Sequence, residues 1–106
     1  MIIINTDHVP GKSISDTLGI ARGSTVRARN LGRDIFAGLK NLVGGEISEY
    51  TKLLADAREE ALQRMVLDAD RMGADAIVNV RFTTSNVMQG CSEILAYGTA
   101  VKLANS

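Results

Sequence analysis

The stretch "RMGADAIVNVRF" at Arg71–Phe82 decides the fold, because a helix ends and a strand begins inside it. Gly73 follows the last residue with helical spacing, which is where glycine most often closes a helix. After Gly73, apolar and polar residues alternate, as in a strand with one buried face. The alternation predicts two rows: Ala76, Val78, Val80 and Phe82 on one face, and Asn79, Arg81 and Thr83 on the other. A helix followed by such a strand indicates an α+β fold.

Upstream, a long helix is predicted from Ser48 to Gly73. Ser48 is a good N-cap residue, and Glu60 with Arg64 forms a favourable i, i+4 pair. The apolar positions keep helical spacing throughout: Tyr50, Leu53, Leu54, Ala57, Ala61, Met65, Ala69 and Met72. A shorter helix is predicted over residues 31–43, from the stripe Ile35, Phe36, Leu39, Leu42 and Val43.

Gly44 and Gly45 separate the two helices, either as a hinge or as a phosphate-binding loop. A phosphate loop of the Walker type needs GxxxxGK[ST], but Glu46 follows this pair and would repel phosphate. The segment Gly11-Lys12-Ser13 lacks the first glycine of that motif, because Thr6 stands in its place. We therefore interpret the pair as a hinge between helices.

About four strands are expected. "MIII" at residues 1–4 reads as a short buried or paired strand, and Pro10-Gly11 as a turn. Residues 18–29 predict a second strand with Ile20, Val26 and Ala28 on one face. Within it, Gly19 and Gly23 indicate a bulge or a close backbone approach.

Residues 87–103 predict a last strand or strand pair, with Gly90 near a turn. One row of this segment is mostly small and would let a helix pack closely: Ile94, Ala96, Gly98 and Ala100. The opposite row is as apolar: Leu95, Tyr97, Thr99, Val101 and Leu103. A sheet with helices on one side usually has a polar second face, so another subunit is expected to cover this face or an edge of the sheet.

Composition limits the function classes. The chain of 106 residues is expected to form one domain over residues 1–106, and its twelve basic and twelve acidic residues give no net charge. This balance gives no global field towards nucleic acid or a membrane. A single cysteine excludes an intramolecular disulfide, and no apolar run approaches the roughly 18 residues that span a bilayer. The N-terminal "MIIINTDH" lacks the features of a signal peptide, so a cytoplasmic protein is expected.

Four segments in this order resemble the YbjQ-like proteins, a family labelled as heavy-metal-binding whose biochemical function is not established. They are "VPGK" at 9–12, "DIFAGLKNLVGGEISEY" at 34–50, "GADAIVNVRF" at 73–82 and "AYGTAV" at 96–101. The resemblance implies a small α+β subunit, similar to dodecin-like proteins, that forms a ring-shaped homopentamer in the cytoplasm. The family usually has arginine after the double glycine, whereas this chain has Glu46, which speaks against an anion site at that loop.

Soft metals prefer clustered Cys, His or Met ligands. The chain offers one cysteine and one histidine and has no CxxC or HxxxH spacing. His8, beside Asp7, and Cys91 are the candidate metal ligands, and they could meet only through the fold or across subunits. The residues indicate no cofactor, and a divalent or soft metal ion is the one that the family label would allow.

Between Ile20 and Arg33 lie four arginines and no acid. Arginine forks match phosphate geometry, so Arg27 and Arg29 are candidate anion ligands. Lys12 after the turn and Asp75 after the long helix are further candidate ligand-binding residues. The duller interpretation is that the arginines pair with the acidic helix and that Asp75 bonds backbone N–H groups in a tight turn. No aromatic residues interleave with the arginines, which argues against nucleic-acid binding.

No nucleophile stands beside a base, and no pair of carboxylates is indicated at working distance, so an enzyme is not expected. The sequence favours an oligomeric binding or scaffold module. The alternative is a homopentameric ring that binds a small molecule or anion through strand arginines and inter-subunit pockets.

Overall fold

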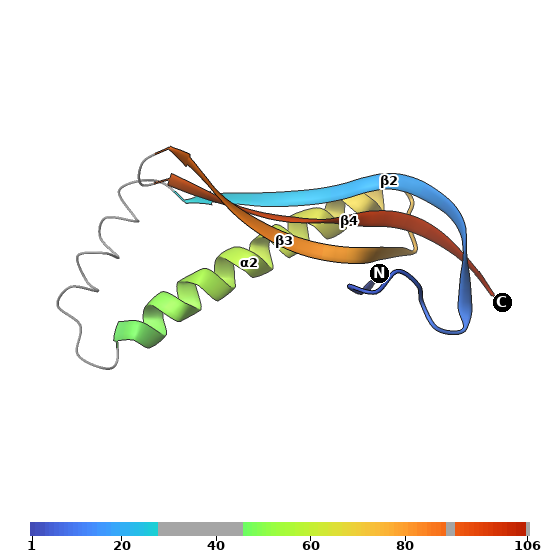
Figure 1. Ribbon diagram of the computed structural model, residues 1–106, viewed down its shortest axis with the longest axis horizontal. Coiled ribbons are helices and arrows are strands. Elements are labelled where there is room, and N and C mark those ends of the chain that lie inside the picture. Colours follow the sequence, from blue (N-terminus) through green and yellow to red (C-terminus); the bar gives the residue numbers. More distant parts are fainter. Residues whose placement is uncertain (28–45, 89–90, 106) are drawn as a thin grey trace.

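The computed structural model describes residues 1–27, 46–88 and 91–105 (Figure 1). It contains β1 (Ile2–Ile3), β2 (Lys12–Arg27), α2 (Glu46–Arg71), β3 (Ala76–Met88) and β4 (Cys91–Asn105). The helix predicted over 31–43, the hinge at Gly44 and Gly45, and Arg29 lie outside the described residues.

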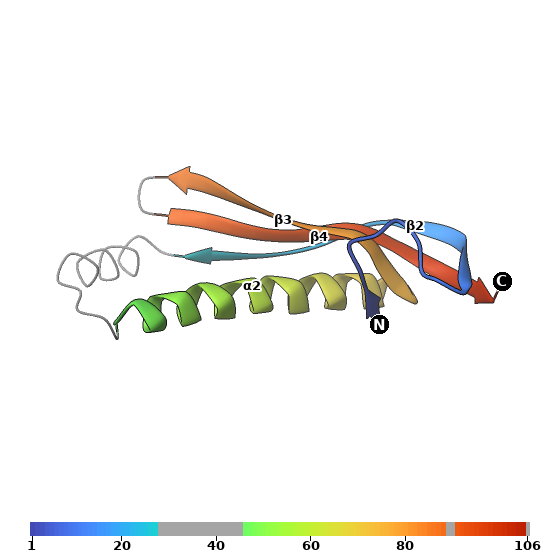
Figure 2. The same ribbon diagram turned by 60° about the horizontal axis from the view of Figure 1, so that its bottom comes forward.

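The four strands form one mixed sheet in the order β1-β3-β4-β2. β1 pairs parallel to β3, and β4 pairs antiparallel with both β3 and β2. α2 forms a second layer along one face of this sheet (Figure 2). The expected α+β class with about four strands and a long helix is confirmed.

Gly73 caps the C-terminal end of α2, as the sequence predicts. Gly73 has φ 81°, in the left-handed region that a side chain disfavours. Its N–H donates to the carbonyl of Asp70 at 3.0 Å, and the N–H of Ala74 donates to that of Ala69 at 3.1 Å. These two bonds make a Schellman motif, which satisfies the last carbonyls of the helix and turns the chain into β3.

The face of α2 that meets the sheet is built from small side chains around one methionine. Four residues at i, i+4 spacing are almost completely buried: Ala57, Ala61, Met65 and Ala69. On the sheet they meet Ala21, Ile94, Ala96 and Ala100 in one cluster. The small row of the last strand therefore faces the helix, as predicted.

The sequence predicted a bulge or a close backbone approach at Gly19 and Gly23, and each glycine has one of these two roles. Gly19 has φ 132° and stands at a register shift between β2 and β4, so it occupies a bulge. Gly23 lies directly beneath α2, where an added Cβ would meet the backbone of Ala61, Arg64 and Met65. One glycine bends the strand and the other permits the close approach of the helix.

The predicted row on β3 is wrong beyond Val78. Ala76 and Val78 pack with Val9 and Val101 in one cluster, whereas Ile77 and Val80 belong to the cluster under α2. The cause is a bulge between Val78 and Arg81, where Asn79 has φ 55°. One extra residue in the strand moves every later side chain to the other face.

The conformation of Asn79 makes a testable prediction. Asparagine tolerates the left-handed region, and glycine does so without cost, whereas a β-branched residue is strained there. We expect Asn79→Gly to keep the free energy of unfolding within about 0.5 kcal/mol of the parent, and Asn79→Val to lose about 1–3 kcal/mol. Urea denaturation of the three proteins measures this difference. Equal stability of the two variants would contradict the role of the bulge.

Two strand boundaries also differ from prediction. β2 begins at Lys12 rather than near residue 18, because the polar residues after the turn pair with the end of β4, Lys12 opposite Asn105. β3 continues to Met88, and β4 starts at Cys91, so the predicted last segment contains the end of one strand and most of the next.

The chain itself covers part of the sheet face opposite α2. Val9, Ile4 and Leu103 pack around Val101 on this side, so at this end the chain covers its own apolar row. The N-terminal segment supplies the cover, because Ile4 and Thr6 hydrogen-bond along β3. Further along the face, Tyr97 stays exposed.

Candidate functional site

The described candidate ligand-binding residues lie at two ends of the sheet. Lys12 and Asp75 are placed at the end of β4 where Asn105 lies: the Nζ of Lys12 donates to the Oδ1 of Asn105 at 3.4 Å. Arg27 pairs with Ser92 at the other end of β4, about 40 Å away along the strand. The structure does not bring these residues together into one site.

Asp75 has a structural partner. Its Oδ2 accepts a hydrogen bond of 2.9 Å from the backbone N–H of Leu103, and its own N–H donates to the carbonyl of Val101 at 2.9 Å. This is the tight-turn interpretation that the sequence allowed. The carboxylate joins the end of α2 to β4.

The candidate metal ligands are also far apart. The Nδ1 of His8 lies 2.8 Å from the Oδ1 of Asp7 in the exposed turn after β1, whereas Cys91 begins β4 at the opposite end of the sheet. The hydrogen bond from His8, with the charge of its ring when protonated, lowers the pKa of the Asp7 carboxyl below its ordinary value of 3.8. Within residues 1–27, 46–88 and 91–105, no three His, Cys, Asp or Glu side chains gather as a metal cluster. The described donors of one chain thus do not fit a heavy-metal site.

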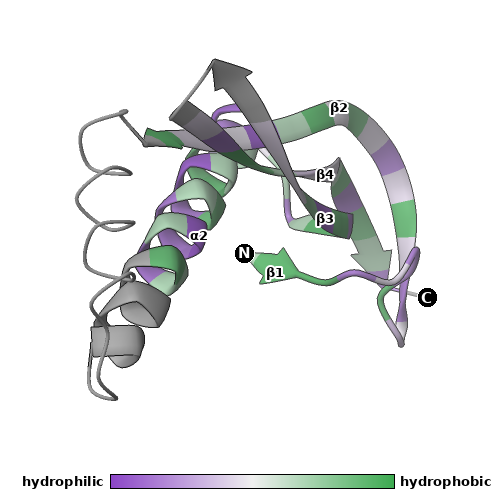
Figure 3. Cartoon of the chain, turned by 60° about the vertical axis from the view of Figure 1, so that its left-hand side comes forward, coloured by the Kyte–Doolittle hydropathy of each residue, from purple (hydrophilic) through white to green (hydrophobic). Residues whose placement is uncertain are grey.

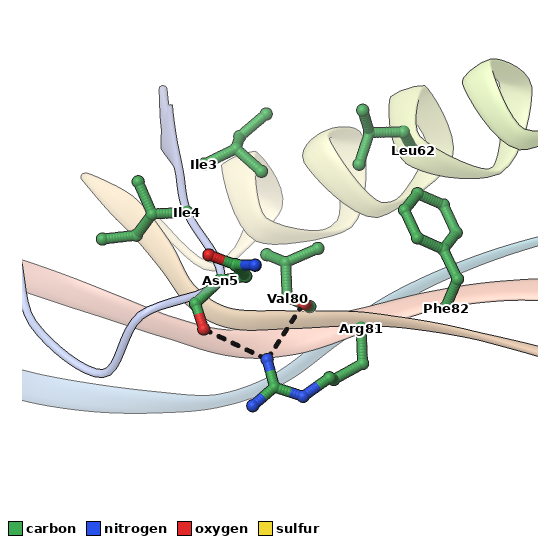
Figure 4. Close-up of a pocket in the computed structure, with 7 residues that line it drawn as sticks. All are labelled: Ile3, Ile4, Asn5, Leu62, Val80, Arg81 and Phe82. Carbon is green, nitrogen blue, oxygen red and sulfur yellow. Dashed lines mark hydrogen bonds between the residues drawn. The ribbon is translucent and has the colours of Figure 1, made fainter.

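An apolar groove that the sequence did not indicate lies between the N-terminal segment, β3 and α2 (Figure 4). It encloses about 590 Å³ and is lined by Ile3, Ile4, Asn5, Leu62, Val80, Arg81 and Phe82. A neighbouring hollow of about 460 Å³ shares Ile3 and Leu62 and continues along the helix past Glu59, Gln63, Val66 and Leu67. We call the two together the α2 groove. The apolar β1 faces α2 across it (Figure 3).

The charged group of Arg81 is directed away from this groove. Its guanidinium points away from Leu62 and Phe82 (Figure 4), and one nitrogen donates to the carbonyls of Asn5 at 3.1 Å and Val80 at 3.2 Å. The arginine therefore fastens the N-terminal segment to β3. Most of the other residues that line the groove are apolar, which suits the binding of an apolar group.

The sheet face opposite α2 is the second exposed apolar surface. Because Ala21, Gly23 and Thr25 face the helix, alternation places Ile20, Arg22 and Val26 on the opposite face. Tyr97 lies opposite Arg22 on one side and Arg81 on the other. Ile20 is 57% exposed, Val26 55% and Tyr97 36%. We call this surface, made of Ile20, Arg22, Val26, Arg81 and Tyr97, the outer sheet face.

The outer edge of β2 is partly closed by side chains of α2. The carboxylate of Asp68 accepts a 3.0 Å hydrogen bond from the backbone N–H of Arg22. Arg64, which is paired with Glu60, donates to the carbonyl of Ser24 at 2.5 Å. Because these edge groups already have partners, the middle of β2 is a poor place for another strand to add.

Sequence reasoning missed the α2 groove because its lining comes from segments far apart in the chain. The available signals were weak: Leu62, Val66 and Leu67 lie beside the buried stripe of the helix, and "MIII" is too apolar for a free terminus. Neither signal shows which of these residues meet.

None of the described helical residues forms a segment long and apolar enough to cross a membrane.

Comparison with known proteins shows where the chain belongs. The YbjQ_1 family model, described as "Putative heavy-metal-binding", matches residues 1–104. A "UPF0145 protein" of Methanosarcina acetivorans is 63% identical over 105 residues, which cover 99% of both chains. One of Archaeoglobus fulgidus is 59% identical over 103 residues, covering 97% of this chain and 95% of the relative.

A solved structure shares the fold. It is a crystal structure from Pediococcus pentosaceus described as a protein with unknown function of the DUF74 family. It superposes with a TM-score of 0.64 at 18% identity and covers 98% of each chain. The family match, the close relatives and the shared fold agree over almost the whole chain, which therefore belongs to the YbjQ family of UPF0145 proteins.

Proposed function

We propose that residues 1–106 form a single domain that works in the cytoplasm as a homo-oligomeric binding module, assembled as a ring-shaped homopentamer. The observation that carries this proposal is the outer sheet face. Ile20 and Val26 remain more than half exposed there, and Tyr97 lies on the same face, opposite Arg22. Exposed apolar side chains that share one face of a sheet are typical of protein interfaces.

A ring supplies the cover that a single chain lacks. The N-terminal segment protects Val101 at one end of the face but leaves the region around Tyr97 open. A second subunit would bury this region, and each buried aliphatic side chain there contributes about 1.5–3 kcal/mol. The binding function would then belong to the assembly.

Heavy-metal binding enters this proposal only as a property of the assembly. Asp7 and His8 offer two donors in an exposed turn, and a tetrahedral soft-metal site needs more. Cys91 and His8 of one chain lie at opposite ends of the sheet. A site that uses them therefore requires donors from more than one subunit.

A second candidate is a small-molecule or anion-binding ring with its pockets between subunits. The α2 groove favours it, because a hollow of about 590 Å³ has the size of a ligand site yet lacks an outer wall in one chain. A neighbouring subunit would provide that wall. Arg27 and Arg29 stay the proposed anion ligands of this version, and Lys12 and Asp75 have the intramolecular partners described above.

Native mass spectrometry of the untagged protein, purified without chelator, tests both candidates. We expect the mass of a pentamer of 11.3 kDa chains. A stoichiometric metal on it would support the heavy-metal version, and a bound organic mass would support the second candidate. A bare pentamer that takes up no added Zn(II), Cu(II) or Ni(II) would argue against metal binding. A monomer at micromolar concentration would contradict the assembly itself.

A further inference from the structure

We propose that the outer sheet face binds a nucleoside phosphate, with the base stacked on Tyr97 and the phosphate held by Arg22 and Arg81. This inference rests on the second candidate function, and it names the class of ligand and the residues that bind it. A neighbouring subunit that covers the outer sheet face would form the outer wall of this site.

The three side chains form one row across the sheet. Tyr97 on β4 pairs with Arg22 on β2 and with Arg81 on β3. Residues that lie directly opposite each other on neighbouring strands have their side chains on the same face. Figure 4 agrees for Arg81, whose guanidinium lies on the side of β3 opposite Leu62 and Phe82. Because neighbouring strands are about 4.8 Å apart, the row spans about 10 Å and places the aromatic ring between two cations.

The row is open to a ligand. Arg22, Arg81 and Tyr97 are all exposed. The guanidinium of Arg22 makes no hydrogen bond or ion pair with another described residue. In Arg81, one nitrogen donates to the carbonyls of Asn5 and Val80, and the other two nitrogens have no partner among the described residues. Both arginines therefore have N–H groups to donate to an anion.

These residue types match the two parts of a nucleoside phosphate. Arginine binds phosphate through a planar fork of N–H donors, and any base can stack on an aromatic side chain. Leu95 lies two residues from Tyr97 on β4, so it is on the same face, and it is half-buried. It extends the apolar surface under a stacked base. A base on Tyr97 then has an arginine on each side for its phosphate.

The neighbouring rows of the outer sheet face indicate a small ligand rather than a polymer. They are uncharged: Ile20, Thr99 and Val78 in one, and Ser24, Leu95 and Thr83 in the other. Basic side chains thus do not continue from row to row, as binding of a polynucleotide backbone requires. Glu93 lies on the same face, about 13 Å from Tyr97 along β4, where it would repel a further phosphate.

Isothermal titration of the full-length chain with AMP, adenosine and inorganic phosphate tests the site. We expect AMP to bind about tenfold or more tightly than either of the others, because only AMP has both a base and a phosphate. Arg22→Gln and Tyr97→Leu should each weaken AMP binding by about tenfold or more. Tyr97→Phe keeps the aromatic ring and should bind AMP within about twofold of the parent.

Arg58→Gln is the matched control for the loss of one positive charge. Arg58 is exposed on α2, in the other layer of the molecule, so its replacement should leave AMP binding within about twofold of the parent. Circular dichroism and native mass spectrometry of each variant report whether the fold and the subunit number are unchanged. If Tyr97→Leu disturbs either, the comparison of Arg22→Gln with Arg58→Gln decides.

Three results would overturn the inference. The first is AMP that binds no more tightly than inorganic phosphate or adenosine. The second is AMP binding that Arg22→Gln leaves unchanged, or that Arg58→Gln weakens equally, since the effect of charge would then be general. The third is an adenosine tetranucleotide that binds more than about tenfold more tightly than AMP, which would mean that the face takes single-stranded nucleic acid.

Failure of this site and failure of the proposed function are distinguishable. Native mass spectrometry of the parent protein reports the assembly without AMP. An oligomeric parent that binds AMP no better than phosphate would overturn the inference alone. A monomeric parent that binds AMP as expected would overturn the assembly alone and leave the site in place.

Discussion

Replacing Gly23 by alanine should cost about 3 kcal/mol or more of the free energy of unfolding, which is at the upper end for a single added methyl group. The new Cβ would lie 2.6 Å from the carbonyl carbon of Arg64 and would also overlap the backbone nitrogen of Met65 and the carbonyl oxygen of Ala61. Backbone atoms cannot rotate away as a side chain can, so α2 would have to move off the sheet. For a domain of this size we expect a loss of about 10–20 °C in Tm.

Gly98→Ala is the matched control, because Gly98 also lies on the face of the sheet towards α2. There the added Cβ would lie 2.7 Å from Cγ2 of Ile77, 2.9 Å from the carbonyl oxygen of Val78 and 3.1 Å from Cγ2 of Val80. These overlaps are shallower than those at Gly23 and only one of them is with the backbone, so the loss should be smaller, about 2 kcal/mol. Urea denaturation at one fixed protein concentration compares the two variants. If Gly23→Ala proved the milder of them, the helix would not lie as close to β2 as described.

Met65→Ala should destabilise the chain by about 3 kcal/mol. Met65 is fully buried, and its neighbours in the interface, Ala61 and Ala69 on the helix and Ala21 on β2, are too small to fill the space that it would leave. An interface made mostly of alanines relaxes poorly around a cavity, because an alanine has no side chain that can turn into the space.

Met72→Ala makes the same chemical change seven residues later, at the first residue after α2. Met72 is only partly buried against the cluster, so about 1 kcal/mol should be lost. The difference in the free energy of unfolding between the two variants isolates the contribution of the cavity. Chemical denaturation measures it, provided that the denaturant slope is the same for both variants. Equal losses of stability would show that Met65→Ala removes only the free energy of transferring the side chain from water, with no added cost of a cavity.

Helical periodicity predicted the packed side of α2 between residues 57 and 69, because one spacing rule holds over this part of the helix, whereas Leu54 of the predicted stripe is exposed. The interface with the sheet contains Ala57, Ala61, Met65 and Ala69. Gly73 ends the helix because it has the left-handed conformation that glycine adopts readily. Strand periodicity failed at Asn79, because a bulge inverts the faces without changing composition. Nothing in "VNVRF" marks the inversion except a residue that tolerates the left-handed region.

The candidate site was less predictable than the fold. Charged residues such as Arg27 and Lys12 stand out in a sequence, yet the sheet carries them to opposite ends. The α2 groove instead joins Ile3 near the N-terminus to Leu62 on the helix, through the parallel pairing of β1 with β3. Such a contact depends on which strand the two residues of β1 pair with. The local sequence pattern does not determine that pairing.

The position of β1 has a practical consequence for anyone who fuses this chain to another protein. Met1 lies two residues before Ile3, which lines both hollows of the α2 groove, so an affinity tag placed ahead of it would stand at the mouth of the groove. A fusion after Asn105 would leave from the far end of β4, beside Lys12 (Figure 1). A carboxy-terminal label therefore offers the safer handle for purification and imaging.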